Sequence, residues 1–218
     1  MTNGLVVGTP RLPDATIIGF ASRYPLVLVN RVVPGVAHVV IDTPGGMSQA
    51  CEHFASLGHR FVAYLAGPRA SWADRSRWRA LQTAGRRLGL TMTRLGPFAP
   101  TVAGGAAAAE AVVVSGANAV VAFNDLLAIG TIRRLTARGI GVPRDISVLG
   151  CDDIFGADFC HPAPTTLAAP IQDAGRTAVD LLLRVLAGSD RASLGRAVFP
   201  THLVVRESTG QPPRGDAR

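Results

Sequence analysis

The sequence predicts an open, doubly wound α/β fold, in which parallel strands alternate with helices. Short apolar runs rich in Val, Ile and Leu lack the alternation of half-exposed strands, which indicates parallel strands buried on both faces. These runs are residues 4–8, 26–30, 38–42, 61–67, 119–124 and 146–152. Helical patterns lie between them, and several end in Gly, the common residue just beyond a helix. These patterns are residues 46–58, 73–89, 104–116 and 125–139.

The last part of the chain continues this pattern. Residues 171–188 predict a further helix, and residues 197–208 predict a final strand. Residues 210–218 are rich in Gly and Pro and are expected to be disordered. A boundary between two lobes is expected near Gly67–Pro68, where a strand runs into a turn that contains proline.

Length and composition narrow the class of protein. The 218 residues, 48% of them hydrophobic, suffice for one large domain or two small lobes with real cores. No apolar run is long enough to predict a membrane span, and the first residues show no secretory signal. The cysteines Cys51, Cys151 and Cys160 have neither metal-site spacing nor the even number of a disulfide framework. We therefore expect a cytoplasmic protein without a membrane partner.

The chain carries a net charge of +7, and all 22 of its basic residues are arginine. A GC-rich genome explains this composition most simply, and a surface that binds a polyanion is the alternative. The arginines are dispersed, and the only dense set lies within residues 75–87. The charge therefore permits a nucleic-acid partner without identifying one.

Polar residues follow four of the predicted strands, and in open parallel sheets ligands bind beyond the carboxyl ends of the strands. The residues at these ends are Asn30–Arg31, Asp42, Asn124–Asp125 and Asp152–Asp153. The alternative is local, because Asn and Asp also cap helices and form turns. We expect Asp125 to be the helix cap, which leaves Asn124 to face a ligand. Asp152 is preferred over Asp153, whereas Asp42 and Arg31 fit either a cleft or an interface between lobes.

The chemistry of these residues suits a neutral ligand that carries several hydroxyl groups. Carboxylates and amides form hydrogen bonds with vicinal hydroxyls, and an arginine adds further donors. Trp72 fits an apolar platform for a sugar ring or a nucleobase equally as well as it fits a buried structural role.

Enzyme motifs are absent from the sequence. It contains no GxSxG elbow, no P-loop, no GxGxxG after a strand and no HExxH, and its five histidines form no ligand cluster by spacing. The pair Asp152–Asp153 fits a Mg²⁺ site in principle, but neither a nucleophile nor a phosphate-binding loop accompanies it. The sequence therefore predicts a protein that is not an enzyme and that has neither a cofactor nor a metal.

Several motifs together closely resemble the effector-binding core of LacI/GalR-type bacterial transcriptional regulators. In order, they are 25-PLVLVNR-31, 56-SLGHRFVAYLAGP-68, 71-SWADRSRWRAL-81, 124-NDLLAIGTIRRL-135, 139-GIGVPRDISVLGCDD-153 and 164-PTTL-167. Each motif alone is modest, but their order and spacing are specific, and they run nearly from end to end of the chain.

The resemblance implies a two-lobed, periplasmic-binding-protein-like (type I) fold with doubly wound parallel sheets and an effector cleft between the lobes. Its expected parts are a partial N-terminal lobe over 1–67, a C-terminal lobe over 68–168, a helix returning to the N-terminal lobe over 169–196, a final strand of the C-terminal lobe over 197–209, and the tail over 210–218. By motif, Arg77, Asn124 and Asp152 match effector-contacting positions. Members of the family are similar in forming homodimers, often with sugar or nucleobase effectors.

Some features depart from the family pattern. Ala80, Cys151 and Ala169 replace residue types that are common at these positions, so the identity of an effector does not carry over. No helix-turn-helix pattern precedes residues 4–8, and the chain opens at what resembles the third strand of the first lobe. An incomplete N-terminal lobe with an exposed edge strand is therefore expected.

These observations favour the ligand-sensing core of a LacI-type repressor, in which only a full-length form with a helix-turn-helix would bind operator DNA. The alternative is a sugar-binding protein of a transport system, which shares the fold but needs export. An α/β enzyme that uses Asp152 and Asp153 is the least favoured reading.

Overall fold

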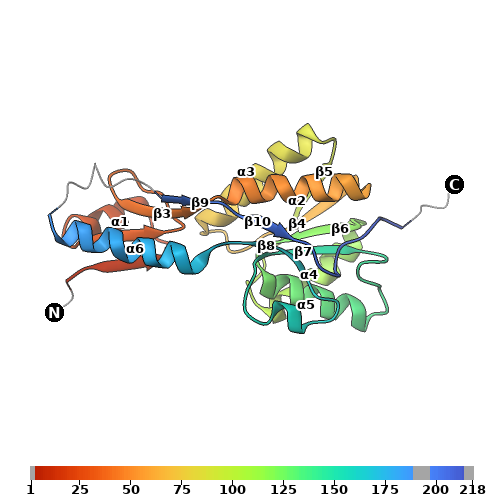
Figure 1. The fold of residues 1–218 in the computed structure, drawn as a ribbon. Coiled ribbons are helices and arrows are strands. Elements are labelled where there is room, and N and C mark those ends of the chain that lie inside the picture. Colours follow the sequence, from red (N-terminus) through yellow and green to blue (C-terminus); the bar gives the residue numbers. More distant parts are fainter. Residues whose placement is uncertain (1–2, 189–196, 214–218) are drawn as a thin grey trace. The chain divides into compact units, whose positions relative to one another are not determined.

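The computed structural model describes residues 3–188 and 197–213 of the protein, and these form two compact units (Figure 1). Unit 1 comprises Met1–Asp42, Ala70–Ala73 and Ala169–Thr201, and unit 2 comprises Thr43–Arg69, Asp74–Ala168 and His202–Arg218. Both units are built on parallel strands, as the predicted α/β fold requires. None of the described helices is long and apolar enough to cross a membrane.

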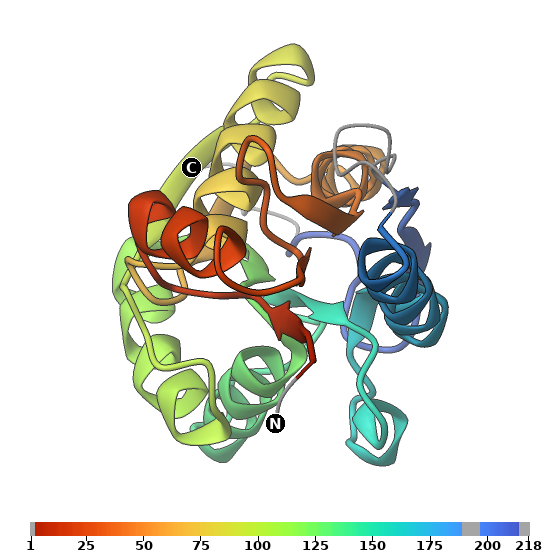
Figure 2. The ribbon, with the colours of Figure 1, turned by 90° about the vertical axis from the view of Figure 1, so that its left-hand side faces the viewer.

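Unit 1 is a four-stranded parallel sheet with a helix on each face. Its elements are β1 (Leu5–Gly8), α1 (Asp14–Ala21), β2 (Leu26–Val29), β3 (Ala37–Ile41), α6 (Ile171–Leu186) and β9 (Ala197–Phe199), and the strand order is β1-β2-β3-β9. Because side chains alternate along a strand, Leu26 and Leu28 of β2 pack with α1, whereas Val27 packs with α6. Figure 2 shows the red α1 and the blue α6 on opposite sides of these strands.

Unit 2 is a larger sheet with two helices on each face. Its strands are β4 (Phe61–Leu65), β5 (Thr91–Leu95), β6 (Ala119–Ala122), β7 (Ser147–Asp152), β8 (Thr165–Ala168) and β10 (His202–Val204), in the order β10-β8-β7-β6-β4-β5. All neighbours pair in parallel except β10, which is antiparallel to β8. The helices are α2 (Thr43–Leu57), α3 (Trp72–Arg87, its first two residues counted with unit 1), α4 (Val102–Ser115) and α5 (Asp125–Ala137), with the short 3-10 helix η1 (Ala157–Phe159).

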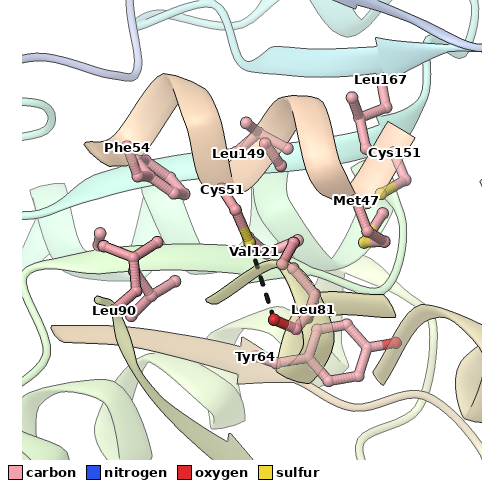
Figure 3. Packing of buried hydrophobic residues seen from close by; sticks show 14 of the residues in the cluster. Met47, Cys51, Phe54, Tyr64, Leu81, Leu90, Val121, Leu149, Cys151 and Leu167 are labelled. Atoms are coloured by element: carbon pink, nitrogen blue, oxygen red, sulfur yellow. Dashed lines mark hydrogen bonds between the residues drawn. The ribbon is translucent and has the colours of Figure 1, made fainter. Parts of the chain in front are cut away.

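One face of this sheet packs against α2 and α3, and the other packs against α4 and α5. Figure 3 shows the first core, in which Met47, Cys51 and Phe54 of α2 meet Val121 and other apolar residues of the strands. The second core is built by the residues that alternate with these on the strands, together with apolar residues of α4 and α5. The predicted doubly wound arrangement is confirmed.

Helices α4 and α5 approach so closely that their backbones touch at two glycines. A Cβ atom on Gly130 would lie 2.0 Å from the carbonyl oxygen of Val102, and one on Gly105 would lie 2.3 Å from that of Leu127. Only glycine fits at these positions. The contact fixes α5, whose first residue reaches the carboxyl edge of the sheet.

The predicted division of the chain differs from the observed units in two places. Residues 43–67 lie in unit 2 rather than with residues 1–42, because α2 packs its apolar face in the core of the six-stranded sheet, to which β4 belongs. The predicted final strand is two short strands, with β9 pairing in unit 1 and β10 in unit 2. Pro200 stands between them and lacks the N–H group that a continuous ladder needs.

The predicted tail is partly described. Gly210 donates a backbone hydrogen bond to the Ser147 hydroxyl at 3.0 Å, and its carbonyl lies 2.9 Å from Nε2 of the buried His59. Residues 214–218 of that tail, and residues 189–196 of the predicted returning segment, lie outside the described residues. His59 therefore has a structural role, in joining the C-terminal segment to unit 2.

Candidate ligand-binding site at the carboxyl edge of the six-stranded sheet

The carboxyl ends of β6 and β7 lie side by side, because the two strands pair in parallel with Val121 opposite Leu149. The residues that follow these ends are therefore neighbours as well. They include Asn124 after β6 and Asp152–Asp153 at the end of β7. The N-terminal turns of α3 add Asp74 and Arg77 to the same unit.

Arg77 and Asp152 form an ion pair at this edge, with 2.9 Å between Nη2 and Oδ1. The Nη1 group donates to the backbone carbonyl of Phe123, and the guanidinium carbon lies 4.8 Å from the centre of the Phe123 ring, a cation–π geometry. The side chain of Arg77 is 11% exposed, and its buried Nε has no hydrogen-bond partner among the described residues. We call Arg77, Phe123, Asn124 and Asp152 the Arg77 cluster.

The charge on Arg77 is stable in this setting. Burial by itself lowers the pKa of the guanidinium, but the negative charge of Asp152 and its hydrogen bond offset this effect and hold the pKa above its ordinary value. The positive charge is thus matched by a carboxylate within the site, so the pair has no net charge.

Asp152 is open to solvent and has an unusual backbone. Its side chain is 37% exposed. Arg77 donates to Oδ1, and among the described residues Oδ2 accepts no hydrogen bond from another side chain. Its φ is 103°, and φ of the next residue, Asp153, is 51°, so two successive residues lie in the region that favours glycine. Such a conformation costs on the order of 1–3 kcal/mol per residue and persists only where the surroundings enforce it. Backbone of this kind is concentrated at functional sites.

The carboxylate of Asp153 is bound within unit 2. It lies 2.7 Å from Nη2 of Arg206, which follows β10. Arg206 also donates to the carbonyl of Pro164, so this pair ties the end of β7 to the segment around β8. The preference for Asp152 over Asp153 as a ligand contact stays a prediction.

Asn124 is the cap of α5, and the expectation that Asp125 fills this role is wrong. The Asn124 side chain accepts a hydrogen bond from the backbone of Leu127 at 3.0 Å and donates to the carbonyl of Pro100 at 3.3 Å. The extended backbone of Asn124, with φ −151°, brings its amide back over the first turn. Asp125, one residue later, is the first helical residue and points into the sheet.

The carboxylate of Asp125 is fully buried, with 0% exposure. It accepts hydrogen bonds from the Thr166 hydroxyl at 2.7 Å and from the Ile154 backbone at 2.9 Å. Burial raises the pKa of Asp125 to about 6, against the opposing effect of these two hydrogen bonds. The sequence pattern gave no sign of this burial, because an acid at the start of a helix normally faces water.

A second polar cluster surrounds Asp74, which also has 0% exposure. Its Oδ1 accepts from the Tyr64 hydroxyl at 2.9 Å and from the Gly67 backbone at 2.7 Å, and its Oδ2 pairs with Arg94 of β5. Sequence reasoning missed this cluster, which we call the Asp74 cluster. Its one visible signal is an acidic residue in the first turn of α3, an ordinary feature of helices.

The remaining predicted residues belong to unit 1. Trp72 is half-buried at the start of α3. Arg31 is buried and pairs with Asp14 of α1 at 2.5 Å, and Asp42 follows β3, where its backbone donates to the carbonyl of Phe199 at 2.7 Å. Within unit 2, Arg77 thus donates hydrogen bonds to Asp152 and to the carbonyl of Phe123, the residue before Asn124.

Among residues 3–188 and 197–213, no group of three or more His, Cys, Asp or Glu side chains could hold a metal ion. Burial raises the pKa of Cys51 and of Cys151 to about 12, so both thiols stay protonated.

Comparisons with known proteins agree with this class of fold. Residues 51–209 match the family model of the periplasmic binding protein-like domain. The chain is 34% identical over 217 residues to the HTH-type transcriptional regulator GalS of Salmonella typhimurium, an alignment that covers 94% of this chain and 62% of GalS. The chain therefore spans less than two thirds of the length of that relative.

Solved structures give the same result. A CelR–cellobiose complex is similar with a TM-score of 0.84 at 29% identity, covering 95% of this chain and 66% of that chain. A dimeric Lac repressor is similar with a TM-score of 0.86 at 27% identity, covering 97% and 79%. The fold and the site define a periplasmic-binding-protein-like module. The chain belongs to the periplasmic binding protein-like domain family, and it is similar to the core of LacI/GalR-type transcriptional regulators.

Proposed function

We propose that this chain is the ligand-sensing core of a LacI-type transcriptional repressor and that the Arg77 cluster binds its effector, a sugar or a related polyhydroxylated molecule. The observation that carries the proposal is the Arg77–Asp152 pair. It combines a buried arginine that retains an unused Nε donor with a partly exposed carboxylate on a strained backbone. Strain of this kind has no benefit for folding and is typical of binding sites.

The cluster suits vicinal hydroxyl groups. The carboxylate of Asp152 accepts hydrogen bonds from two hydroxyls, the guanidinium of Arg77 donates, and the amide of Asn124 can do either. Because Arg77 and Asp152 neutralise each other, a neutral ligand is favoured over an anion, which would meet the charge of Asp152. We further propose that Trp72 supplies an apolar platform for the ring of the sugar. Asp42, Asp153 and Arg31 are secondary candidates for a ligand contact.

The names of relatives support a sugar as effector and a regulator as the whole protein. One similar structure is a CelR–cellobiose complex, and another is a LacI family regulator from Enterococcus faecium with bound ribose, at 25% identity. The matched relatives are transcriptional regulators, so a transport protein is not favoured and an enzyme is not proposed. Effector binding would bias the protein between states with different affinity for DNA.

We propose a homodimer, by analogy with the dimeric Lac repressor, and a cytoplasmic location, where operator DNA lies. Operator binding is proposed only for a form of the protein that carries a helix-turn-helix segment. Sedimentation of the purified chain tests the dimer, because a single monomeric species at micromolar concentration would contradict it.

Isothermal titration calorimetry with a panel of cellobiose, ribose, galactose and adenosine tests the binding function. We expect saturable binding of at least one sugar at one site per chain, and weaker binding of that sugar by Trp72→Ala. Absence of heat and of thermal stabilisation with every member of the panel would contradict a sugar or nucleoside effector. Binding of adenosine alone would favour a nucleoside over a sugar.

A further inference from the structure

The carboxylate of Asp125 links two separate elements beneath the Arg77 cluster. Its Oδ1 takes the hydroxyl hydrogen bond of Thr166 on β8, and its Oδ2 takes the backbone N–H of Ile154, which follows Asp152 and Asp153 directly. The backbone N–H of Ile154 only donates and an ionised carboxylate only accepts, so this contact requires an oxygen. An amide in place of the carboxylate removes the charge, and it keeps this contact only with its oxygen toward Ile154 and its NH₂ group toward the Thr166 hydroxyl.

Gly150 makes room for this carboxylate. A Cβ atom at Gly150 would lie 2.1 Å from Oδ1 of Asp125, far inside van der Waals contact. Strand β7 therefore carries a glycine, Gly150, at the point where the Asp125 carboxylate approaches the backbone of the strand. A substitution at this position offers a way to displace Asp125 without changing it.

The segment held in this way is the strained one. Asp152 and Asp153 both have positive φ, and neither is glycine. Two hydrogen bonds hold the residues that follow Asp152. The backbone N–H of Ile154 donates to Asp125, and Arg206 donates to the Asp153 carboxylate. Loss of the first bond removes one restraint on this segment, while the pairing of Asp152 with Ala168 remains. Relaxation of Asp152 to negative φ would then move its carboxylate away from Arg77.

We infer that Asp125 is a positioning residue, which holds Asp152 in the orientation that binds the sugar without touching the sugar itself. This inference rests on the proposed function of the Arg77 cluster. If only a fraction of molecules hold Asp152 in place, the apparent affinity is the intrinsic affinity multiplied by that fraction.

The test compares Asp125→Asn with Thr131→Val, a variant on the same helix. Thr131 is also fully buried, and its hydroxyl bonds to the carbonyls of Leu127 and Gly105, so its loss lowers stability without reaching β7. We expect Asp125→Asn to weaken sugar binding at least about ten-fold, and Thr131→Val to leave the affinity within about two-fold at a similar loss of melting temperature. Equal effects of the two variants on affinity would contradict the inference.

A double-mutant cycle separates positioning from general damage. In a chain that already carries Asp152→Asn, Asp125→Asn should cost no further affinity, because the residue that it positions no longer has its carboxylate. Additive losses would overturn the inference. If Asp125→Asn does not fold, Thr166→Val disturbs the same carboxylate more mildly and is expected to show the same pattern.

A readout without ligand distinguishes failure of this inference from failure of the proposed function. In crystals of ligand-free Asp125→Asn, we expect φ of Asp152 to become negative and the bond between Asp152 and Arg77 to be lost. Retention of both would contradict the inference even if the wild-type chain binds a sugar. Their loss would support the positioning even if no sugar in the panel binds.

Discussion

The Asp74 cluster and the Arg77 cluster start on the same helix, three residues apart, and have opposite characters. Asp74 is fully buried, and its two oxygens take bonds from Tyr64, Gly67 and Arg94. Arg77 is buried too, but its Nε remains without a partner among the described residues, and the carboxylate that it holds is 37% exposed. One cluster is saturated by the protein, and the other retains capacity for hydrogen bonds.

The difference shows how to separate structural from functional ion pairs in one fold. A saturated pair that joins β4, β5 and α3 on ordinary backbone stabilises the fold. An unsaturated pair on a strained backbone costs stability, and evolution retains it where it binds something. Residue types alone do not make this distinction, because each cluster contains one arginine–aspartate ion pair.

The largest expected effect is on stability, at Asp74. Asp74→Ala leaves the buried Tyr64 hydroxyl and the Gly67 N–H without an acceptor and should lower the free energy of unfolding by about 3–5 kcal/mol. Asp152→Ala should lower it by less than Asp74→Ala does, since the Asp152 side chain is 37% exposed whereas that of Asp74 is fully buried. Urea unfolding of the two variants measures both changes in the free energy of unfolding, provided that the m-value stays the same as in the wild type. A larger loss for Asp152→Ala would reverse our assignment of the two clusters.

The next effect concerns the pH dependence of stability, and it arises at Asp125, a buried carboxylate with no cationic partner among its hydrogen bonds. Its pKa is raised from 3.8 to about 6 by burial. Between these values the folded state keeps a proton that the unfolded chain has lost, so the contribution of Asp125 to stability falls as pH rises from about 4 to 6 and is constant above. The loss is at most about 3 kcal/mol. Asp125→Asn should show a shallower decline than the wild type, and identical slopes would contradict this account.

A smaller effect is expected on ligand affinity at Asp152. Asp152→Ala should weaken sugar binding by about 1–3 kcal/mol, or roughly 5- to 150-fold, by calorimetry, while the melting temperature stays nearly unchanged. Asp158, an exposed carboxylate in η1, provides the matched control, and Asp158→Ala should have no effect on affinity. Equal losses for both variants would indicate a general charge effect instead of a contact.

The smallest effect separates the two roles of Asn124, as helix cap and as ligand contact. Serine caps helices as well as asparagine does, so Asn124→Ser should keep stability, whereas Asn124→Ala should lose about 1 kcal/mol. Both should weaken sugar binding, because neither retains the amide. Thermal unfolding and calorimetry on the two variants decide the matter. Full affinity in Asn124→Ser would confine Asn124 to capping.

The sequence could predict the fold class and the polar strand ends, because buried parallel strands leave continuous apolar runs that end at one edge. It could not predict β5, which lies at the sheet edge and carries polar residues such as Arg94, or the short α1, whose apolar residues merge with the flanking strands. Arg77 appeared only through the family resemblance, since an arginine on a helix normally faces solvent. The roles of Asp74 and Asp125 depend on which side chains point inward, and this is decided by packing against distant strands.

The central claim is that the unsaturated cluster binds the effector and the saturated one does not. The most direct test is a parallel calorimetric titration of the wild type, Arg77→Met and Arg94→Met with whichever sugar the wild type binds best. We expect Arg77→Met to weaken binding by at least about 30-fold, as for loss of a buried charged partner. Arg94→Met, which removes the arginine of the saturated cluster, should leave affinity within about three-fold and lower stability instead. Unchanged affinity in Arg77→Met, or equal losses in the two variants, would contradict the account.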